Sequence, residues 1–191
     1  MEERFRPASP EDAGLLLDLY APYVENTSIT FEYRVPTREE FAQRVRKVTA
    51  ALPWLVCLQD GRLAGYAYAA PYYTRAAYQW DAELSVYLAP EFQRRGIGGR
   101  LCRAVTEIIR RQGYVNLYSL ITVPNPGSES LHRSLGFREL AVYRSTGYKL
   151  GAWHDVGLWE KQLAPPPAQP EKPLPFPELP PEVLEEILAQ A

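Results

Sequence analysis

The stretch Gln93-Arg94-Arg95-Gly96-Ile97-Gly98-Gly99-Arg100 separates two segments of different periodicity. Before it, residues 81–88 alternate between two faces, which is typical of a strand. After it, residues 101–112 place apolar side chains at helical spacing and charged side chains on the opposite side. The unit is therefore predicted to be a strand, a glycine-rich turn and a helix.

The start of this helix is a candidate anion site. The first turn of a helix leaves N–H groups without intrahelical partners, and the aligned peptide dipoles make that end partly positive. Three glycines let an anion approach these amides closely, and Arg94 and Arg95 add positive charge. Residues 94–99 therefore predict a phosphate or pyrophosphate site. A P-loop would need Lys-Ser/Thr after the glycines, but Arg100-Leu101 follows.

Composition limits the class of protein. The chain has 191 residues, 46% of them apolar, which is enough for one globular domain with a core. A net charge of −2 argues against a nucleic-acid partner or a membrane surface as partner. No apolar run approaches the ~20 residues of a membrane-spanning helix, and the N-terminus is charged, so we expect a cytoplasmic protein. The spacing of His and Cys suggests no metal site, and Cys57 and Cys102 are expected to be buried free thiols.

The rest of the chain reads as alternating strands and helices. Ser9 and Thr37 begin sequences typical of capped helices, and Pro22 is expected to kink or end the first of them. Asp60-Gly61 is typical of a hairpin turn. The further expected elements are strands at 5–7, 54–58, 63–70, 115–123, 137–149 and 154–162, and a short helix at 128–135.

The last part of the chain differs in composition. Nine of the 18 prolines lie between Pro165 and Pro181. We therefore expect the main domain to cover residues 1–163, and residues 164–191 to form an extended proline-rich linker and a short acidic helix outside the core. That helix is expected to be mobile or to dock weakly on a partner subunit.

Motifs are spread over residues 4–163: the glycine-rich turn and residues 52–56, 77–80, 82–87, 124–125, 132–137 and 151–157. Together they resemble those of the GNAT N-acetyltransferases. The likeness extends more narrowly to phosphinothricin acetyltransferases and their relatives that acetylate methionine sulfone and methionine sulfoximine. It implies an α+β fold with a central mixed, mostly antiparallel, twisted sheet flanked by helices. It also implies acetyl-CoA as acyl donor, a small amino-acid-like acceptor and a homodimer.

The resemblance implies which residues hold acetyl-CoA. In this family the amides of the turn hold the pyrophosphate, and the preceding strand pairs through its backbone with the pantetheine arm. The amide of Asn125 can hold a pantetheine amide as donor and acceptor. The expected CoA-binding residues are Val86, Tyr87, Leu88, Gln93, Arg94, Arg95, Gly96, Ile97, Gly98, Gly99, Arg100, Asn125 and Ser128.

Acetyl transfer to an amine also needs a proton acceptor, because an aliphatic amine at neutral pH is mostly protonated. Glu83 lies just ahead of the turn and matches the family's glutamate base; the alternative is a strand glutamate paired with an arginine across the sheet. His132 stands where many GNAT enzymes carry a tyrosine that donates to the CoA thiolate. Three roles for His132 stay open: donating to the thiolate, relaying the proton of the amine, or shaping the pocket.

Four residues are candidates for the acceptor pocket: Phe31, Arg75, Tyr78 and Ser85. Arg75 can bind a carboxylate or phosphinate through a bidentate fork, which favours a carboxylated acceptor over a polyamine. The resemblance places its loop near a subunit interface. Two other functions stay open: acetylation of a protein N-terminus, a lysine or a polyamine, and binding of CoA without catalysis.

Overall fold

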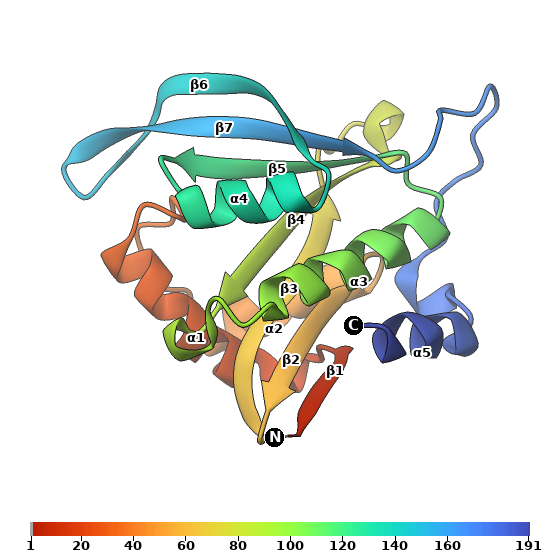
Figure 1. Ribbon diagram of the computed structural model, residues 1–191, viewed down its shortest axis with the longest axis horizontal. Coiled ribbons are helices and arrows are strands. Elements are labelled where there is room, and N and C mark those ends of the chain that lie inside the picture. Colours follow the sequence, from red (N-terminus) through yellow and green to blue (C-terminus); the bar gives the residue numbers. More distant parts are fainter. Residues whose placement is uncertain (1) are drawn as a thin grey trace.

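The protein is built around one seven-stranded sheet with the strand order β1-β2-β3-β4-β5-β7-β6 (Figure 1). The structure is a computed structural model that describes residues 2–191. Only the β4–β5 pair is parallel; the other neighbouring strands are antiparallel. The strands are β1 (Glu3–Pro7), β2 (Trp54–Gln59), β3 (Arg62–Pro71), β4 (Asp81–Leu88), β5 (Asn116–Val123), β6 (Arg138–Lys149) and β7 (Ala152–Gln162). The predicted α+β sheet architecture is confirmed.

Helices cover both faces of this sheet. In Figure 1, α3 and α4 lie in front of the sheet, and α1 and α2 lie behind it. The helices are α1 (Ala13–Asn26), α2 (Arg38–Thr49), α3 (Ile97–Arg111), α4 (Pro126–Ser134) and α5 (Pro181–Ala189); short 3-10 turns include η2 (Ala76–Tyr78) and η3 (Pro90–Phe92).

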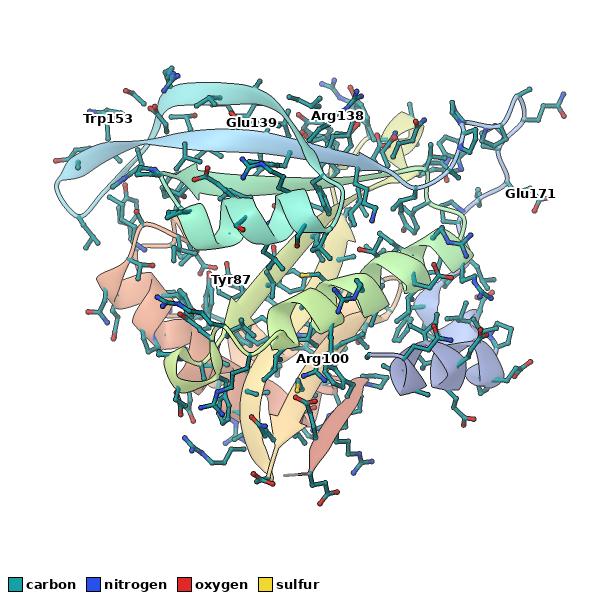
Figure 2. The ribbon with its side chains drawn as sticks, in the orientation of Figure 1. Tyr87, Arg100, Arg138, Glu139, Trp153 and Glu171 are labelled. Carbon is teal, nitrogen blue, oxygen red and sulfur yellow. The ribbon has the colours of Figure 1, made fainter. Side chains whose placement is uncertain are left out.

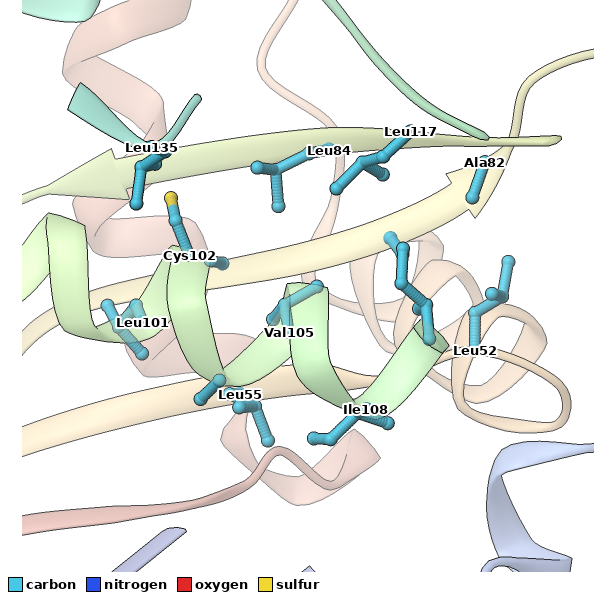
Figure 3. Packing of buried hydrophobic residues seen from close by; sticks show 14 of the residues in the cluster. Leu52, Leu55, Ala82, Leu84, Leu101, Cys102, Val105, Ile108, Leu117 and Leu135 are labelled. Carbon is cyan, nitrogen blue, oxygen red and sulfur yellow. The ribbon is translucent and has the colours of Figure 1, made fainter. Parts of the chain in front are cut away.

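The predicted strand-turn-helix unit forms the centre of the molecule. The apolar stripe of α3 supplies Leu101, Val105 and Ile108, which are completely buried against side chains of the sheet such as Leu55 and Leu84 (Figure 3). A second apolar cluster fills the space between the sheet and the helix pair α1–α2. Because the sheet is buried on both faces, α3 and the turn before it are held in a fixed position relative to β4.

The parallel pair β4–β5 is short, and this opens the sheet. The two strands pair only from residue 81 to 83 on β4 and from 116 to 118 on β5. Beyond this point the Ser119 hydroxyl donates a hydrogen bond to the carbonyl of Leu84 at 3.2 Å. The strands then diverge, so the part of β4 from residue 84 to 88 has an edge without a strand neighbour on its β5 side.

Local signals in the sequence account for most helix ends. Thr37 and Glu40 form the predicted capping box at the start of α2. Pro22, however, does not end the first helix, since α1 continues to Asn26. Tyr20 and Val24 are buried on either side of the proline. Their packing stabilises the helix through the position where a backbone donor is missing.

The prediction that the C-terminal segment lies outside the core is wrong. Phe176, Leu179 and Ile187 are 9%, 7% and 5% exposed and join the cluster around α3. The predicted helix does form, as α5. The amide of Leu174 donates to the carbonyl of Gln112 at 2.8 Å, which fixes the segment to the end of α3. Apolar residues between the prolines make this contact, and a proline-rich composition alone does not reveal it.

Candidate active site

A large cavity, of about 470 Å³, lies where the N-terminus of α3 meets β4 and the start of α4. It brings together residues as far apart in the chain as Val86 and Ser128 that the sequence assigned to one site. The predicted CoA-binding residues that line it are Val86, Leu88, Gln93, Arg94, Gly96, Gly98, Gly99, Asn125 and Ser128.

The backbone of the turn presents its amides to this cavity. Gly96 caps α3 with φ of 80°, a left-handed conformation that favours glycine. A Cβ added at Gly98 would lie 3.1 Å from Cδ1 of Leu88, so a side chain here would require Leu88 to shift by a few tenths of an ångström. The free amides of the first turn and the helix dipole make this end of the cavity suitable for an anion.

The side chains of two predicted CoA-binding residues, Tyr87 and Ile97, pack against other parts of the protein. The ring of Tyr87 lies on the opposite face of the sheet, with its centre 5.1 Å from that of Tyr20 (Figure 2). Ile97 is 1% exposed and belongs to the core around α3. Only their backbone groups are available to a ligand in the cavity.

Two predicted arginines are engaged by neighbouring side chains. The guanidinium of Arg95 lies 5.4 Å from the centre of the Phe92 ring. Arg100 forms a bidentate ion pair with Glu3, and its amide donates to the carbonyl of Gly96 at 3.1 Å (Figure 2). Arg94, by contrast, lines the cavity.

A smaller cavity of about 50 Å³ occupies the gap between the diverging strands β4 and β5. Ser85 and His132 line it, and Val86, Asn125 and Ser128 line both this cavity and the large one. A ligand whose phosphates lie at α3 can therefore extend along the unpaired edge of β4 into the gap in the sheet.

Glu83 lies on β4 where the pairing with β5 ends. It faces the α1–α2 side of the sheet, half-buried, in register with Ala70 on β3 and Tyr118 on β5. It makes no hydrogen bond or ion pair with any residue from 2 to 191, so the alternative of an arginine partner is not what the structure shows. Burial raises the pKa of this carboxyl group, because the charged form loses hydration without gaining a partner.

His132 is 2% exposed and bonded on one side only. Its Nδ1 lies 2.8 Å from the carbonyl oxygen of Ser128, whereas its Nε2 has no hydrogen-bond partner in the part of the chain that the structure describes. A carbonyl only accepts, so Nδ1 carries the proton and Nε2 presents a lone pair. Burial lowers the pKa of His132 and favours this neutral form.

Asn125 caps the start of α4 and lines both cavities. Its Oδ1 accepts from the amide of Ser128 at 3.2 Å, and its own amide donates to Oε1 of Glu129 at 2.7 Å. The side-chain oxygen is thus used as a helix cap. The Nδ2 hydrogens are the groups that Asn125 has left to donate to a ligand.

Within residues 2–191, the four acceptor candidates come from different parts of the chain, and neither the large nor the small cavity is lined by more than one of them. Ser85 lines the small cavity. The ring of Phe31 lies against β6 and is 6.3 Å from the ring of His154. Arg75 and Tyr78 are exposed in the loop around η2, and neither has a hydrogen bond, ion pair or ring contact with Phe31 among residues 2–191.

The structure adds residues that sequence patterns did not assign to the site. Tyr23 of α1 donates its hydroxyl to the carbonyl of Leu88 at 2.6 Å and accepts from Nε2 of Gln93 at 3.3 Å. Tyr23 lies three residues after Tyr20 on α1, a spacing that is equally typical of a core residue. Ile29 and Leu131 complete the wall of the large cavity; only their position in three dimensions identifies them.

Two other classes of site are not found in residues 2–191. No group of three or more His, Cys, Asp or Glu side chains there is arranged to hold a metal ion. None of the helices in that range combines the length and the apolar character needed to cross a membrane.

Comparison with known proteins agrees with this geometry. A family model described as an acetyltransferase (GNAT) domain matches residues 5–158. The chain is 34% identical over 170 residues to the phosphinothricin N-acetyltransferase of Streptomyces viridochromogenes, covering 88% of this chain and 93% of that one. It is 29% identical over 159 residues to the L-methionine sulfoximine/L-methionine sulfone acetyltransferase of Salmonella typhimurium, with coverages of 83% and 93%.

A solved structure is similar to this chain in both fold and sequence. The phosphinothricin acetyltransferase of Sinorhizobium meliloti, crystallised in complex with AcCoA, superposes with a TM-score of 0.86 at 31% identity, covering 94% of this chain and 98% of that one. The family match, the sequence relatives and the shared fold together show that the chain belongs to the GNAT acetyltransferases.

Proposed function

We propose that the protein transfers the acetyl group of acetyl-CoA to the α-amine of a small amino acid or analogue of the phosphinothricin, methionine sulfoximine or methionine sulfone type. The observation that carries this proposal is Glu83, an unpaired, half-buried carboxyl group at the gap in the sheet. A base there adjoins a cavity that leads from an anion site to the same gap.

The residues of the cavity fit acetyl-CoA. The turn amides and Arg94 suit a pyrophosphate, the unpaired edge of β4 at Val86 and Leu88 suits the amides of pantetheine, and Nδ2 of Asn125 can donate to one of them. When bound, acetyl-CoA supplies an activated acetyl thioester. The β4 amide near Val86 is suited to stabilise negative charge on the thioester oxygen.

Glu83 is suited to accept the proton of the acceptor's ammonium group. Because the pKa of Glu83 is raised, it is closer to the pKa of the amine than the pKa of an exposed glutamate is. This favours proton transfer to Glu83, directly or through water. Attack on the thioester is proposed to be direct, in a ternary complex. Cys57 and Cys102 are completely buried, and burial raises the pKa of both thiols to about 12, so neither serves as a nucleophile.

His132 is proposed to relay a proton rather than to donate one of its own. In its neutral form Nε2 has a lone pair and no hydrogen, since the proton is held at Nδ1 by the carbonyl of Ser128. It must therefore take up a proton before it can deliver one to the leaving sulfur. The gap that it lines is where both steps would occur.

The proposed acceptor follows from the relatives and from Arg75. The matched enzymes are named for phosphinothricin, methionine sulfoximine and methionine sulfone. Arg75 is exposed and free of ion pairs within residues 2–191, so its guanidinium is available to a carboxylate or an oxyanion. We propose a homodimer in the cytoplasm in which this loop approaches the neighbouring site, because Arg75 lies apart from Phe31 in one chain.

The test is thiol release from acetyl-CoA with a panel of amines. The panel holds phosphinothricin, methionine sulfoximine, methionine sulfone, ordinary amino acids, spermidine, a lysine peptide and a peptide with a free N-terminus. We expect turnover of the oxyanion-bearing analogues. Turnover of spermidine or a peptide alone would overturn the acceptor assignment, and CoA binding without any turnover would overturn the enzyme assignment.

Glu83→Gln tests the proposed base. We expect kcat/KM at neutral pH to fall about 10²-fold or more, since the amide cannot accept the proton. The KM for acetyl-CoA should change little, because Glu83 does not line the CoA cavity. Glu139→Gln, on the exposed part of β6, is the matched control and should keep full activity (Figure 2). An unchanged kcat/KM for Glu83→Gln would remove the base assignment.

A further inference from the structure

A third cavity, of about 340 Å³, lies on the α1–α2 face of the sheet, which is also the face of Glu83, between α2 and strands β2 and β3. It shares no lining residue with the two cavities of the transfer site. Its volume is in the range of small-molecule sites, which is ~300–1,000 Å³. The family resemblance and the proposed chemistry leave this cavity without a role.

Aromatic rings form its wall. Trp54 and Tyr68 are stacked with their ring centres 4.2 Å apart, Phe41 meets Trp54 edge-on at 5.9 Å, and Tyr66 lies 5.5 Å from Trp54. Tyr20 closes the α1 side. Flat rings in stacked and edge-on arrangements are suited to a further planar apolar group, which gains both buried area and ring contacts.

A polar group on this wall is buried without a partner in the described part of the chain. Trp54 is 3% exposed, and its Nε1 has no hydrogen-bond partner among residues 2–191. Buried polar groups are nearly always bonded, and leaving one unbonded is destabilising. Trp54 therefore has an unused donor at the wall of the cavity.

The rim of the cavity carries a net positive charge. Glu32 accepts from Nη2 of Arg44 at 2.9 Å and from the hydroxyl of Tyr20 at 3.0 Å, so its charge is balanced within the rim. Lys47 lines the same rim, is exposed, and has no ion pair in the described part of the chain. One cation is therefore left for a ligand.

From these features we propose that this cavity binds a small aromatic carboxylate, with the ring against the aromatic wall and the carboxylate at Lys47. Hydrocarbons without charge would leave Lys47 unpaired, and amines would meet the positive rim. The cavity lies one strand from β4, because Tyr68 and Ala70 are in register with Ser85 and Glu83. The proposal does not depend on the acetyl transfer, since it rests on residues outside the transfer site.

The experiment is calorimetric titration of the full chain with 3-phenylpropionate. We expect saturable binding with one site per chain. The cation 3-phenylpropylamine, which has the same ring and chain, should bind at least tenfold more weakly. Lys47→Met should weaken the carboxylate about tenfold, while Lys172→Met, which removes an exposed lysine of the C-terminal segment, should leave it unchanged.

A second readout places the ligand in the cavity. Binding should change the fluorescence of Trp54, and the change should be lost in Trp54→Phe. No saturable binding, equal binding of the amine, or an unaffected Lys47→Met would overturn the proposal. Competition with L-phenylalanine shows which kind of carboxylate the cavity binds. If L-phenylalanine displaces 3-phenylpropionate and is acetylated, the ligand is an acceptor of the acetyl group. If it does neither, the ligand is an aryl carboxylate without an amine.

Discussion

Glu83 and His132 show how the same physical cause moves two pKa values in directions that serve one reaction. Burial without an ionic partner raises the pKa of Glu83 and lowers that of His132, so in both cases the neutral form is favoured. His132 then has a lone pair to offer, and Glu83 when ionised is a stronger base than an exposed glutamate; within residues 2–191 neither group is held by a neighbouring charge. Groups of this kind collect at functional sites.

The unpaired carboxylate should also cost stability. Because the folded-state pKa of Glu83 is raised, the cost is absent below the ordinary glutamate pKa of ~4.3 and fully present above the raised value. We therefore expect Glu83→Gln to raise the thermal midpoint at pH 7 by a few degrees, and the gain to vanish near pH 4. Differential scanning fluorimetry at both pH values checks this, with Glu139→Gln as control; an equal gain at pH 4 would contradict it.

Because only Nδ1 of His132 is hydrogen-bonded within residues 2–191, a substitution can keep that bond and remove Nε2. In His132→Asn the side-chain amide can still donate to the carbonyl of Ser128, but the acceptor at Nε2 is gone. We expect kcat to fall about tenfold or more with little change in KM for acetyl-CoA or in the thermal midpoint. A lower thermal midpoint with unchanged kcat would instead assign His132 a purely structural role.

At the scale of elements, α3 links the anion site to the C-terminal segment. Its N-terminus lines the large cavity, and its other end is held by residues beyond 163. Gln112, at the end of α3, is 2% exposed and donates from Nε2 to the carbonyls of Ala51 and Leu174 at 2.8 and 2.6 Å. This single side chain ties α2, α3 and the C-terminal segment together.

We therefore expect Gln112→Ala to destabilise the fold by about 1–3 kcal/mol, since a buried side chain and its two hydrogen bonds are removed. Urea unfolding followed by circular dichroism measures this. Gln43→Ala, on the exposed side of α2, is the matched control and should change stability by less than about 0.5 kcal/mol. If the two variants were equally stable, the C-terminal segment would not depend on this contact.

At the scale of the whole molecule, the outer strands carry an apolar surface. Leu140, Tyr143, Tyr148, Leu150 and Trp153 are between 42% and 64% exposed along β6 and β7. Trp153 lies at the outer end of these strands (Figure 2). Clusters of exposed large apolar side chains mark interaction surfaces, and a two-fold axis would let this one cover itself.

The proposed homodimer predicts a specific change of mass. We expect sedimentation velocity to show a dimer for the unaltered chain and a shift toward monomer for Trp153→Arg, because a charge would be buried without a partner. Leu15→Arg places the same charge on the exposed side of α1, away from these strands, and should remain dimeric. A monomer for the unaltered chain would leave Arg75 without a neighbouring site to serve.

Periodicity and turn chemistry in the sequence determined the local elements, because these depend on neighbours in the chain. The alternation of residues 81–88, the glycines before α3 and the capping box at Thr37 each predicted the structure that formed. The resemblance carried by spaced motifs predicted the family. Each of these signals and motifs lies within one short stretch of the chain.

Only the tertiary structure decided how these elements meet. The divergence of β4 and β5, the absence of a partner for Glu83, the orientation of His132 and the burial of Phe176 all depend on contacts between residues far apart in the chain. The proline-rich composition wrongly predicted that the C-terminal segment lies outside the core, because composition does not record such contacts. Whether a polar group is left unpaired, and which cavity it lines, follows from packing in three dimensions, which no local pattern records.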